Sequence, residues 1–214
     1  MIIRQIPGWV TVTNSWVVAE GSGGQAIVID VPPETEQVGE YLADLDLAVV
    51  GILLTHGHVD HTGGAGVLAR QTGALAYAHP DDEFLTRHPG DQLRSLFGMV
   101  PTGDFAPPDR IEDLANGDVL KLAGVTLEVR HTPGHTPGHC CFYHADEGFL
   151  FSGDQLFAGS IGRTDLPGGS YQALMDSMWD RVMTLDDEVR VLPGHGPETT
   201  IGRERRHNPF LGGV

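Results

Sequence analysis

Apolar residues occur along the chain in short blocks that are separated by Gly, Pro and Asp. Blocks of about four to eight residues rich in Val, Ile and Leu are typical of buried strands, whereas apolar residues three or four apart predict helices. The pattern predicts strands at residues 9–13, 15–19, 25–30, 47–54, 74–78, 119–122, 125–130, 140–144, 149–152 and 189–192, helices at 32–46, 63–71 and 170–185, and helical turns at 81–86 and 92–97.

The predicted strands and helices follow one another over all 214 residues. The sequence has no Pro/Gly/Ser stretch long enough for a linker and no short-period repeat. A chain of this length is within the range of one domain and can bury a substantial core. We therefore expect a single domain over residues 1–214.

The charge balance is strongly acidic, with 13 basic and 29 acidic residues and a net charge of −16. Such a balance argues against nucleic acid or an anionic membrane surface as a partner. The amino-terminal residues lack the pattern of a secretion signal, and no apolar stretch approaches the length of a membrane span. These features predict a cytoplasmic protein that does not bind membranes.

The two cysteines are neighbours, Cys140 and Cys141, within one predicted strand. Successive side chains of a strand point to opposite faces, so the pair is expected to form neither a disulfide nor a shared metal site. We expect one core thiol and one surface thiol.

The segment with the densest candidate chemistry is residues 55–61, THGHVDH, which we call the histidine loop. It follows the predicted strand 47–54 and precedes the predicted helix 63–71, so it lies where α/β sheets often place their sites. Imidazole is costly to bury unpaired and is a favoured ligand of transition metals. The alternative interpretations are a solvated loop and, for the carboxylate, a helix N-cap. We predict metal binding by His56, His58, His61 and Asp60.

Three later strands also end in candidate ligands. Residues 131–139 read HTPGHTPGH, Gly153 precedes Asp154, and Gly194 precedes His195. His135 lies between two Thr-Pro-Gly turns, which should fix its position, and we predict that it is a ligand. The other histidines of that segment are expected to orient ligands or to be ordinary loop residues.

In this order the motifs resemble the signature of the metallo-β-lactamase superfamily. The resemblance covers residues 56–195 and implies an α+β fold, a four-layer αβ/βα sandwich of two mixed sheets flanked by helices. It also implies that His56, His58 and His135 hold one divalent metal ion, that Asp60, His61 and His195 hold a second, and that Asp154 bridges the two. Imidazole and carboxylate ligands suit zinc, with iron or manganese as alternatives.

Two metal ions about 3.5 to 4 Å apart can activate a bridging hydroxide for attack on an acyl carbonyl, and Asp60 would orient it. Residues 159–170 (GSIGRTDLPGGS) and 193–211 (PGHGPETTIGRERRHNPFL) resemble short bacterial relatives of hydroxyacylglutathione hydrolase, or glyoxalase II. The resemblance implies a metallohydrolase that cleaves a small acyl thioester. The carboxyl-terminal helical domain that helps glyoxalase II bind glutathione is not expected here, because the sequence stops soon after His195.

Two other activities of the same superfamily stay open. A persulfide dioxygenase would use a single iron at His56, His58 and His135, and a lactonase or β-lactamase would share both metals. Arg163 is a candidate for binding a substrate carboxylate, and the alternative is an internal ion pair with a nearby aspartate. Residues 203–206 (RERR) are expected to form a solvated helix face.

Overall fold

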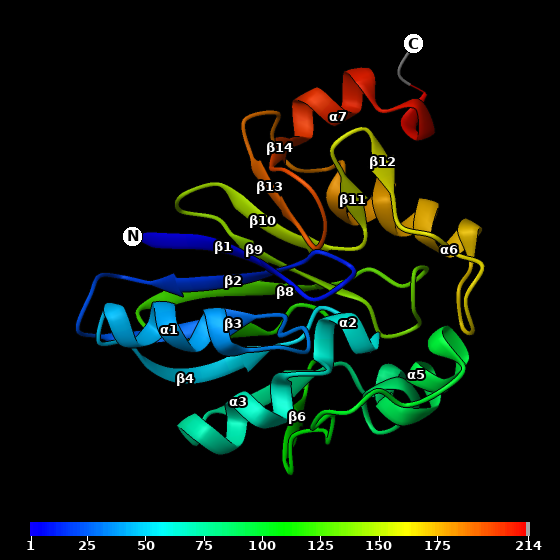
Figure 1. The fold of residues 1–214 in the computed structure, drawn as a ribbon. Coiled ribbons are helices and arrows are strands. Elements are labelled where there is room, and N and C mark those ends of the chain that lie inside the picture. The colour runs from blue at the N-terminus through cyan, green and yellow to red at the C-terminus, as the bar shows by residue number, and fades with distance from the viewer. Residues whose placement is uncertain (213–214) are drawn as a thin grey trace. The chain divides into compact units, whose positions relative to one another are not determined.

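The computed structural model describes residues 1–212. The chain divides into two compact units, the first formed by residues 1–114 with 121–125 and the second by residues 115–120 with 126 onward. Each unit is built on one six-stranded mixed sheet (Figure 1).

The sheet of the first unit begins antiparallel and continues parallel. The first three strands pair antiparallel, and the remaining ones add in parallel, because helices or long connections return the chain to the same end of the sheet. The strands, in the order in which they neighbour one another, are β1 (Ile2–Gly8), β2 (Thr13–Ala19), β3 (Gln25–Ile29), β4 (Ala48–Leu53), β5 (Leu75–Ala78) and β6 (Ile111–Asp113).

Two amphipathic helices, α1 (Glu36–Asp44) and α3 (Ala65–Thr72), cover this sheet. Val38 of α1 and Leu68 of α3 are buried in the same apolar cluster as Val28 and Ile52 of the sheet, and Figure 1 shows both helices beside β3 and β4. Shorter helical segments connect the strands: α2 (Val59–Thr62), the 3₁₀ turn η1 (Pro80–Asp82), α4 (Glu83–Thr86) and α5 (Pro89–Phe97).

The predicted strand at residues 9–13 is wrong, because residues 9–12 form the turn between β1 and β2 and only Thr13, the first residue of β2, lies in a strand. Trp9 and Val12 have φ values of 62° and 56°, which end an extended strand, and the Val12 amide donates to the Trp9 carbonyl at 3.2 Å. The first strand is β1 instead, and it pairs along its whole length with β2. Trp9 therefore lies in the turn between β1 and β2.

The sheet of the second unit is antiparallel except where β10 pairs in parallel with β13. Its helical layer is α6 (Tyr171–Ser177), which continues as a π-helical turn, η2 (Met178–Val182). Leu174 and Met178 pack against Leu150 and Val191 of the sheet. The strands, in sheet order, are β14 (Thr199–Thr200), β13 (Arg190–Pro193), β10 (Phe149–Gly153), β9 (Cys140–His144), β8 (Val125–His131) and β7 (Val119–Leu122).

Most differences from the predicted elements are at their ends. The predicted helix 63–71 is α3, which begins after Gly63 and Gly64, and the separate helical turn α2 precedes these glycines. Ser170 caps α6 by accepting from the Ala173 amide. Short elements had no apolar pattern and were not predicted: β6, β14, the hairpin β11 (Leu156–Phe157) and β12 (Ser160–Ile161), and η3 (Pro209–Leu211). The helix expected at residues 203–206 is α7 (Ile201–His207). The two mixed sheets flanked by helices are confirmed.

Among residues 1–212, no helix combines the length and the apolar character that crossing a membrane requires.

Cys140 and Cys141 are both free and both fully buried, so the expected surface thiol is wrong. Both faces of β9 are covered, and the Cys141 thiol lies near Thr132 Oγ1 and the Ser152 carbonyl. Burial raises the pKa of the Cys141 thiol to about 12.

We therefore expect both thiols of the folded protein to resist alkylation at about pH 8, because the thiolate is the reactive form and the side chains are inaccessible. Mass spectrometry after iodoacetamide treatment would measure this. Denatured protein should take up two adducts and native protein none. Rapid modification of the native chain would contradict the burial described here.

Candidate functional site

The histidine loop follows β4 directly, and its side chains are arranged by contacts within the first unit. His56 and His61 are almost fully buried, and His58 is 9% exposed. His56 Nε2 lies 3.0 Å from His58 Nδ1, so two imidazole nitrogens face each other at the end of the strand. Asp60 follows on α2, and one of its carboxylate oxygens lies 3.7 Å from His61 Nε2.

Asp30 holds both ends of this loop. Its carboxylate is 1% exposed and accepts from the Thr55 amide, the Thr55 hydroxyl and His61 Nδ1, each at 2.8 Å. A carboxylate that accepts from Nδ1 fixes the tautomer in which Nε2 carries a lone pair, which is the usual arrangement behind a metal-binding histidine. The sequence placed Asp30 at the end of a strand but gave no signal of this role.

Asp60 is held from the start of β2. The buried Thr13 hydroxyl donates to Asp60 Oδ2 at 3.1 Å, and Thr11 Oγ1 lies 2.9 Å from Thr13 Oγ1. The Asp60 side chain remains 18% exposed. The structure therefore shows a carboxylate that is oriented on one side and accessible on another, and it shows no side-chain cap from His58, the N-cap residue of α2.

Gly63 is required where α2 meets the segment after β3. A Cβ there would lie 2.6 Å from the Val59 carbonyl and 2.7 Å from Pro33 Cγ, so no larger residue fits without displacing backbone. The adjoining main chain is also paired, since the Val31 amide donates to the His61 carbonyl at 2.7 Å. This close packing fixes the backbone at His61, where the chain leaves the histidine loop.

In the second unit, His135 is placed by a glycine turn and oriented by main chain. Gly134 has a φ of 141°, and a Cβ there would lie 2.1 Å from the Leu174 nitrogen, so only glycine is accommodated. His135 is 2% exposed, and its Nδ1–H donates to the Arg163 carbonyl at 2.7 Å. Its Nε2 lies 3.4 Å from Asp154 Oδ2.

Asp154 lies between two histidines of this unit. His195 Nε2 is 3.6 Å from the same Oδ2 that faces His135, which brings the three predicted ligands of the second unit together. The Asp154 amide donates to His139 Nε2 at 3.0 Å, and His139 Nδ1 in turn contacts the Thr132 hydroxyl at 2.8 Å. The fully buried His139 therefore orients Asp154, as the sequence had allowed.

Arg163 accepts from His135 through its main-chain carbonyl, and its side chain forms an ion pair with Asp165. The guanidinium donates twice to Asp165, both at 2.7 Å, with both side chains largely exposed. These hydrogen bonds lower the pKa of Asp165 to about 2 and raise the pKa of Arg163. The aspartate pair considered as an alternative is present on the surface, and binding of a substrate carboxylate by Arg163 stays a prediction.

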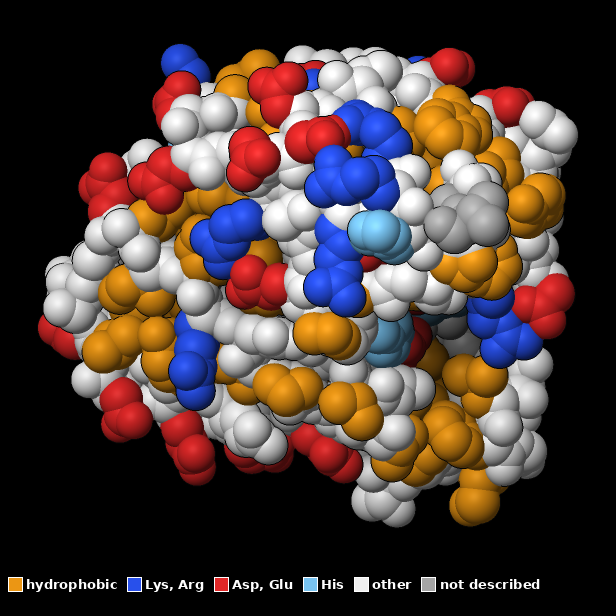
Figure 2. Space-filling model, turned by 90° about the horizontal axis from the view of Figure 1, so that it is seen from above, with side chains coloured by type: hydrophobic (Ala, Val, Ile, Leu, Met, Phe, Trp, Pro, Cys, Tyr) orange, Lys and Arg blue, Asp and Glu red, His pale blue; other side chains and the backbone are white. Residues whose placement is uncertain are grey.

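The segment 203–206 is not simply a solvated face. Figure 2 looks onto α7, where Lys and Arg side chains gather, but Glu204 is 1% exposed and accepts from the Gly159 amide and the Thr199 hydroxyl. Arg205 donates to the Met183 and Leu185 carbonyls. From the sequence alone, a charged motif such as RERR looks like a solvent-exposed helix face, because the partners of its side chains are not apparent.

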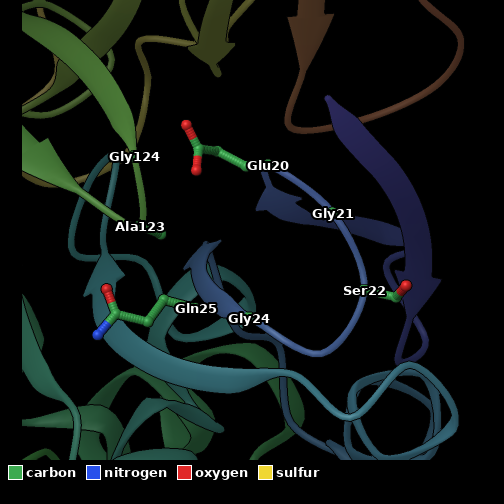
Figure 3. Close-up of a pocket in the computed structure, with 7 residues that line it drawn as sticks. All are labelled: Glu20, Gly21, Ser22, Gly24, Gln25, Ala123 and Gly124. Atoms are coloured by element: carbon green, nitrogen blue, oxygen red, sulfur yellow. The ribbon is translucent and has the colours of Figure 1, made fainter.

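Two hollows lie in the first unit. One, of about 370 Å³, is lined by the turn after β2 and by Ala123 and Gly124, with the Glu20 carboxylate beside the opening (Figure 3), and it contains none of the predicted ligands. The other, of about 380 Å³, is lined by Trp9, Pro33, Phe105 and Gly64, which follows α2. The lining of the second hollow likewise includes none of the predicted ligands.

The donor set fits divalent metal ions. In each unit a buried imidazole has one nitrogen engaged by an orienting acceptor, Asp30 for His61 and the Arg163 carbonyl for His135, while the other nitrogen faces a carboxylate. Oriented imidazoles beside carboxylates are typical of zinc, iron and manganese sites.

A family model described as the metallo-beta-lactamase superfamily matches residues 8–195, which include every predicted ligand. The chain belongs to the metallo-β-lactamase superfamily. The resemblance stated from the sequence is thereby confirmed, and membership supports metal binding and a hydrolase-type enzyme.

Relatives in the superfamily match nearly the whole chain. An uncharacterized protein of Aquifex aeolicus is 43% identical over 99% of this chain and 98% of its own length. Hydroxyacylglutathione hydrolase GloC of Haemophilus influenzae is 41% identical over 87% of each chain.

Two solved structures of superfamily members confirm the fold. BLEG-1, a B3 metallo-β-lactamase, has a TM-score of 0.90 at 35% identity and covers 99% of this chain and 100% of its own. TTHA1623, crystallised in a di-iron-bound form, has a TM-score of 0.86 at 38% identity over 97% of this chain and 100% of its own. The metallo-β-lactamase fold predicted from the sequence is correct.

Proposed function

We propose that this protein is a binuclear metallohydrolase that cleaves an S-acyl thioester. The proposed ligands are His56, His58 and His135 for one ion and Asp60, His61 and His195 for the other, with Asp154 between them. The family match over residues 8–195, which includes the ligands of both units, supports this assignment.

Two bound ions would supply an activated water and polarise the acyl carbonyl. The chain's own contribution is to hold the groups that surround the reaction. Asp60, oriented by Thr13, would accept a hydrogen bond from the attacking water and align it with the carbonyl carbon. The leaving thiol has a pKa near 8.5 when unperturbed, so it can depart as thiolate without a dedicated acid.

The observation that carries the proposal is the hydrogen bond between Asp30 and His61. A mononuclear centre at His56, His58 and His135 has no need of His61, yet a fully buried carboxylate fixes the ring of His61 at 2.8 Å. Support of this kind is typical of a metal ligand. It favours two ions over one, and so favours hydrolysis over the single-iron persulfide dioxygenase.

The substrate class rests on the relatives. GloC, which is 41% identical, is named for the hydrolysis of hydroxyacylglutathione. We infer a small acyl thioester as substrate, with zinc as the first candidate metal and iron as the second, because TTHA1623 was crystallised with two irons.

We expect protein purified without added metal and without oxygen to hold close to two metal ions per chain by elemental analysis. It should hydrolyse at least one member of a panel of hydroxyacylglutathione and simpler acyl thioesters, followed by thiol release. Chelation should remove that activity and zinc or iron should restore it.

The same preparations test the alternatives. If the protein holds one iron per chain and consumes oxygen in the presence of glutathione persulfide, it is a dioxygenase and not a hydrolase. Hydrolysis of penicillins or cephalosporins without thioesterase activity would favour a β-lactamase, the class to which BLEG-1 is assigned.

A further inference from the structure

The middle of the histidine loop is held by residues other than Asp30. Asp82, 1% exposed at the end of η1, accepts from the Gly57 amide through Oδ2 at 2.8 Å. The contact is close, because a Cβ on Gly57 would lie 2.6 Å from Leu85 Cβ and 3.0 Å from the Asp82 carbonyl. The segment after β5 therefore packs directly on the loop.

Gln92 of α5 contacts the loop on both sides of His58. Its Oε1 accepts from the Val59 amide at 2.9 Å, and its Nε2 donates to the Gly57 carbonyl at 3.0 Å and to the Leu85 carbonyl at 3.0 Å. One amide side chain thus satisfies the donor at the first residue of α2, Val59, and the acceptor two residues earlier, Gly57. α5 itself is anchored by the fully buried Leu93.

These contacts divide the support of the loop into two sets. Asp30 fixes Thr55 and His61, at the ends, whereas Asp82 and Gln92 fix Gly57 and Val59, in the middle. His58 lies between Gly57 and Val59, the two residues that this second set holds. Fixing the peptide groups on each side of a residue restricts the direction in which its side chain leaves the backbone.

We propose that Gln92, with Asp82, is a positioning residue for His58. The hydrogen bonds of Gln92 go to main-chain atoms, so its effect passes through the backbone of Gly57 and Val59. Losing it should let the loop fluctuate and should weaken metal binding through His58, while the buried sheet and the contacts of Asp30 persist. The link to catalysis rests on the proposed function, whereas the link to loop order does not.

Two substitutions distinguish the hydrogen bond that the Gln92 side chain accepts from the two that it donates. Gln92→Met keeps the length of the side chain and removes all three hydrogen bonds, whereas Gln92→Glu keeps an acceptor for the Val59 amide and removes both donated bonds. Gln172→Met is the matched control, because Gln172 lies exposed on α6 and donates only to Asp176 Oδ1.

The first measurement is amide hydrogen exchange of the full-length, metal-free chain, resolved by residue with NMR. In Gln92→Met we expect the Val59 amide to exchange on the order of 10-fold faster, with the Gly57 amide still protected by Asp82 and the strand β4 unchanged. Gln92→Glu should retain protection at Val59. Unchanged exchange at Val59 in Gln92→Met, or equal acceleration throughout β4, would overturn the proposal.

The second measurement is the loss of zinc to EDTA from the zinc-loaded variants. We expect zinc to dissociate on the order of 10-fold faster from Gln92→Met than from wild type or Gln172→Met. In thioester hydrolysis, kcat should fall more than KM rises. If the chain hydrolyses no thioester, the exchange and zinc measurements still decide the role of Gln92, so failure of the proposed function is distinguishable from failure of this inference.

Discussion

His58→Ala should lower thioester hydrolysis by on the order of 10³-fold or more while leaving the fold intact. The ring of His58 lies 3.0 Å from His56, and its removal takes one imidazole from the proposed centre. The backbone around it keeps the contacts of Asp30, Asp82 and Gln92. Steady-state kinetics and circular dichroism would measure both effects, and elemental analysis should show less bound metal.

His207→Ala is the control for that experiment, because His207 is an exposed residue at the end of α7. Its activity and metal content should equal those of wild type. A His58→Ala enzyme with undiminished turnover would remove His58 from the site and would refute the ligand assignment of the histidine loop.

Asp30→Asn should weaken metal binding by about 10- to 100-fold, although the side chain keeps its shape. Asparagine tolerates the φ of 56° at this position, and its amide oxygen can still accept from Thr55. The amide nitrogen, however, would donate to His61 Nδ1, so the imidazole proton would move to Nε2. A protonated Nε2 cannot bind a metal, so a sub-stoichiometric metal content is expected.

A zinc titration monitored by competition with a chromophoric chelator would measure this affinity. Loss of a charged acceptor should also lower the free energy of unfolding of the metal-free chain by roughly 1 to 3 kcal/mol. Asp44→Asn, on the exposed face of α1, is the matched control. Wild-type affinity in Asp30→Asn would mean that His61 is not a ligand.

Apolar runs were sufficient to predict the central strands, since β3, β4, β8, β9, β10 and β13 are each close to a predicted block. They failed at residues 9–13, where Trp, Val and Thr are typical of strands but form a turn. Positive φ values at Trp9 and Val12 come from the pairing of β1 with β2, and neither residue type signals them.

The ligand candidates could be predicted because histidine and aspartate recur after strand ends in a recognisable order. The residues that hold these ligands in place through hydrogen bonds could not be predicted. Asp82 and Gln92 are ordinary residues of weakly patterned segments, and only the fold brings them to residues 25 and 33 positions earlier in the sequence. Glu204 was hidden in the same way, because a buried acid within RERR looks like a surface charge until Thr199 and Gly159 are seen to contact it.

The partners that shape the histidine loop, Thr13, Asp30, Asp82 and Gln92, all precede residue 93. During synthesis the ribosome therefore releases this loop together with those four side chains before it translates His135, Asp154 or His195. Since chains begin to fold from the amino end as they emerge, four of the seven proposed ligands can acquire their final geometry co-translationally. Each proposed metal site would then be completed only when the later part of the polypeptide supplies His135 or His195.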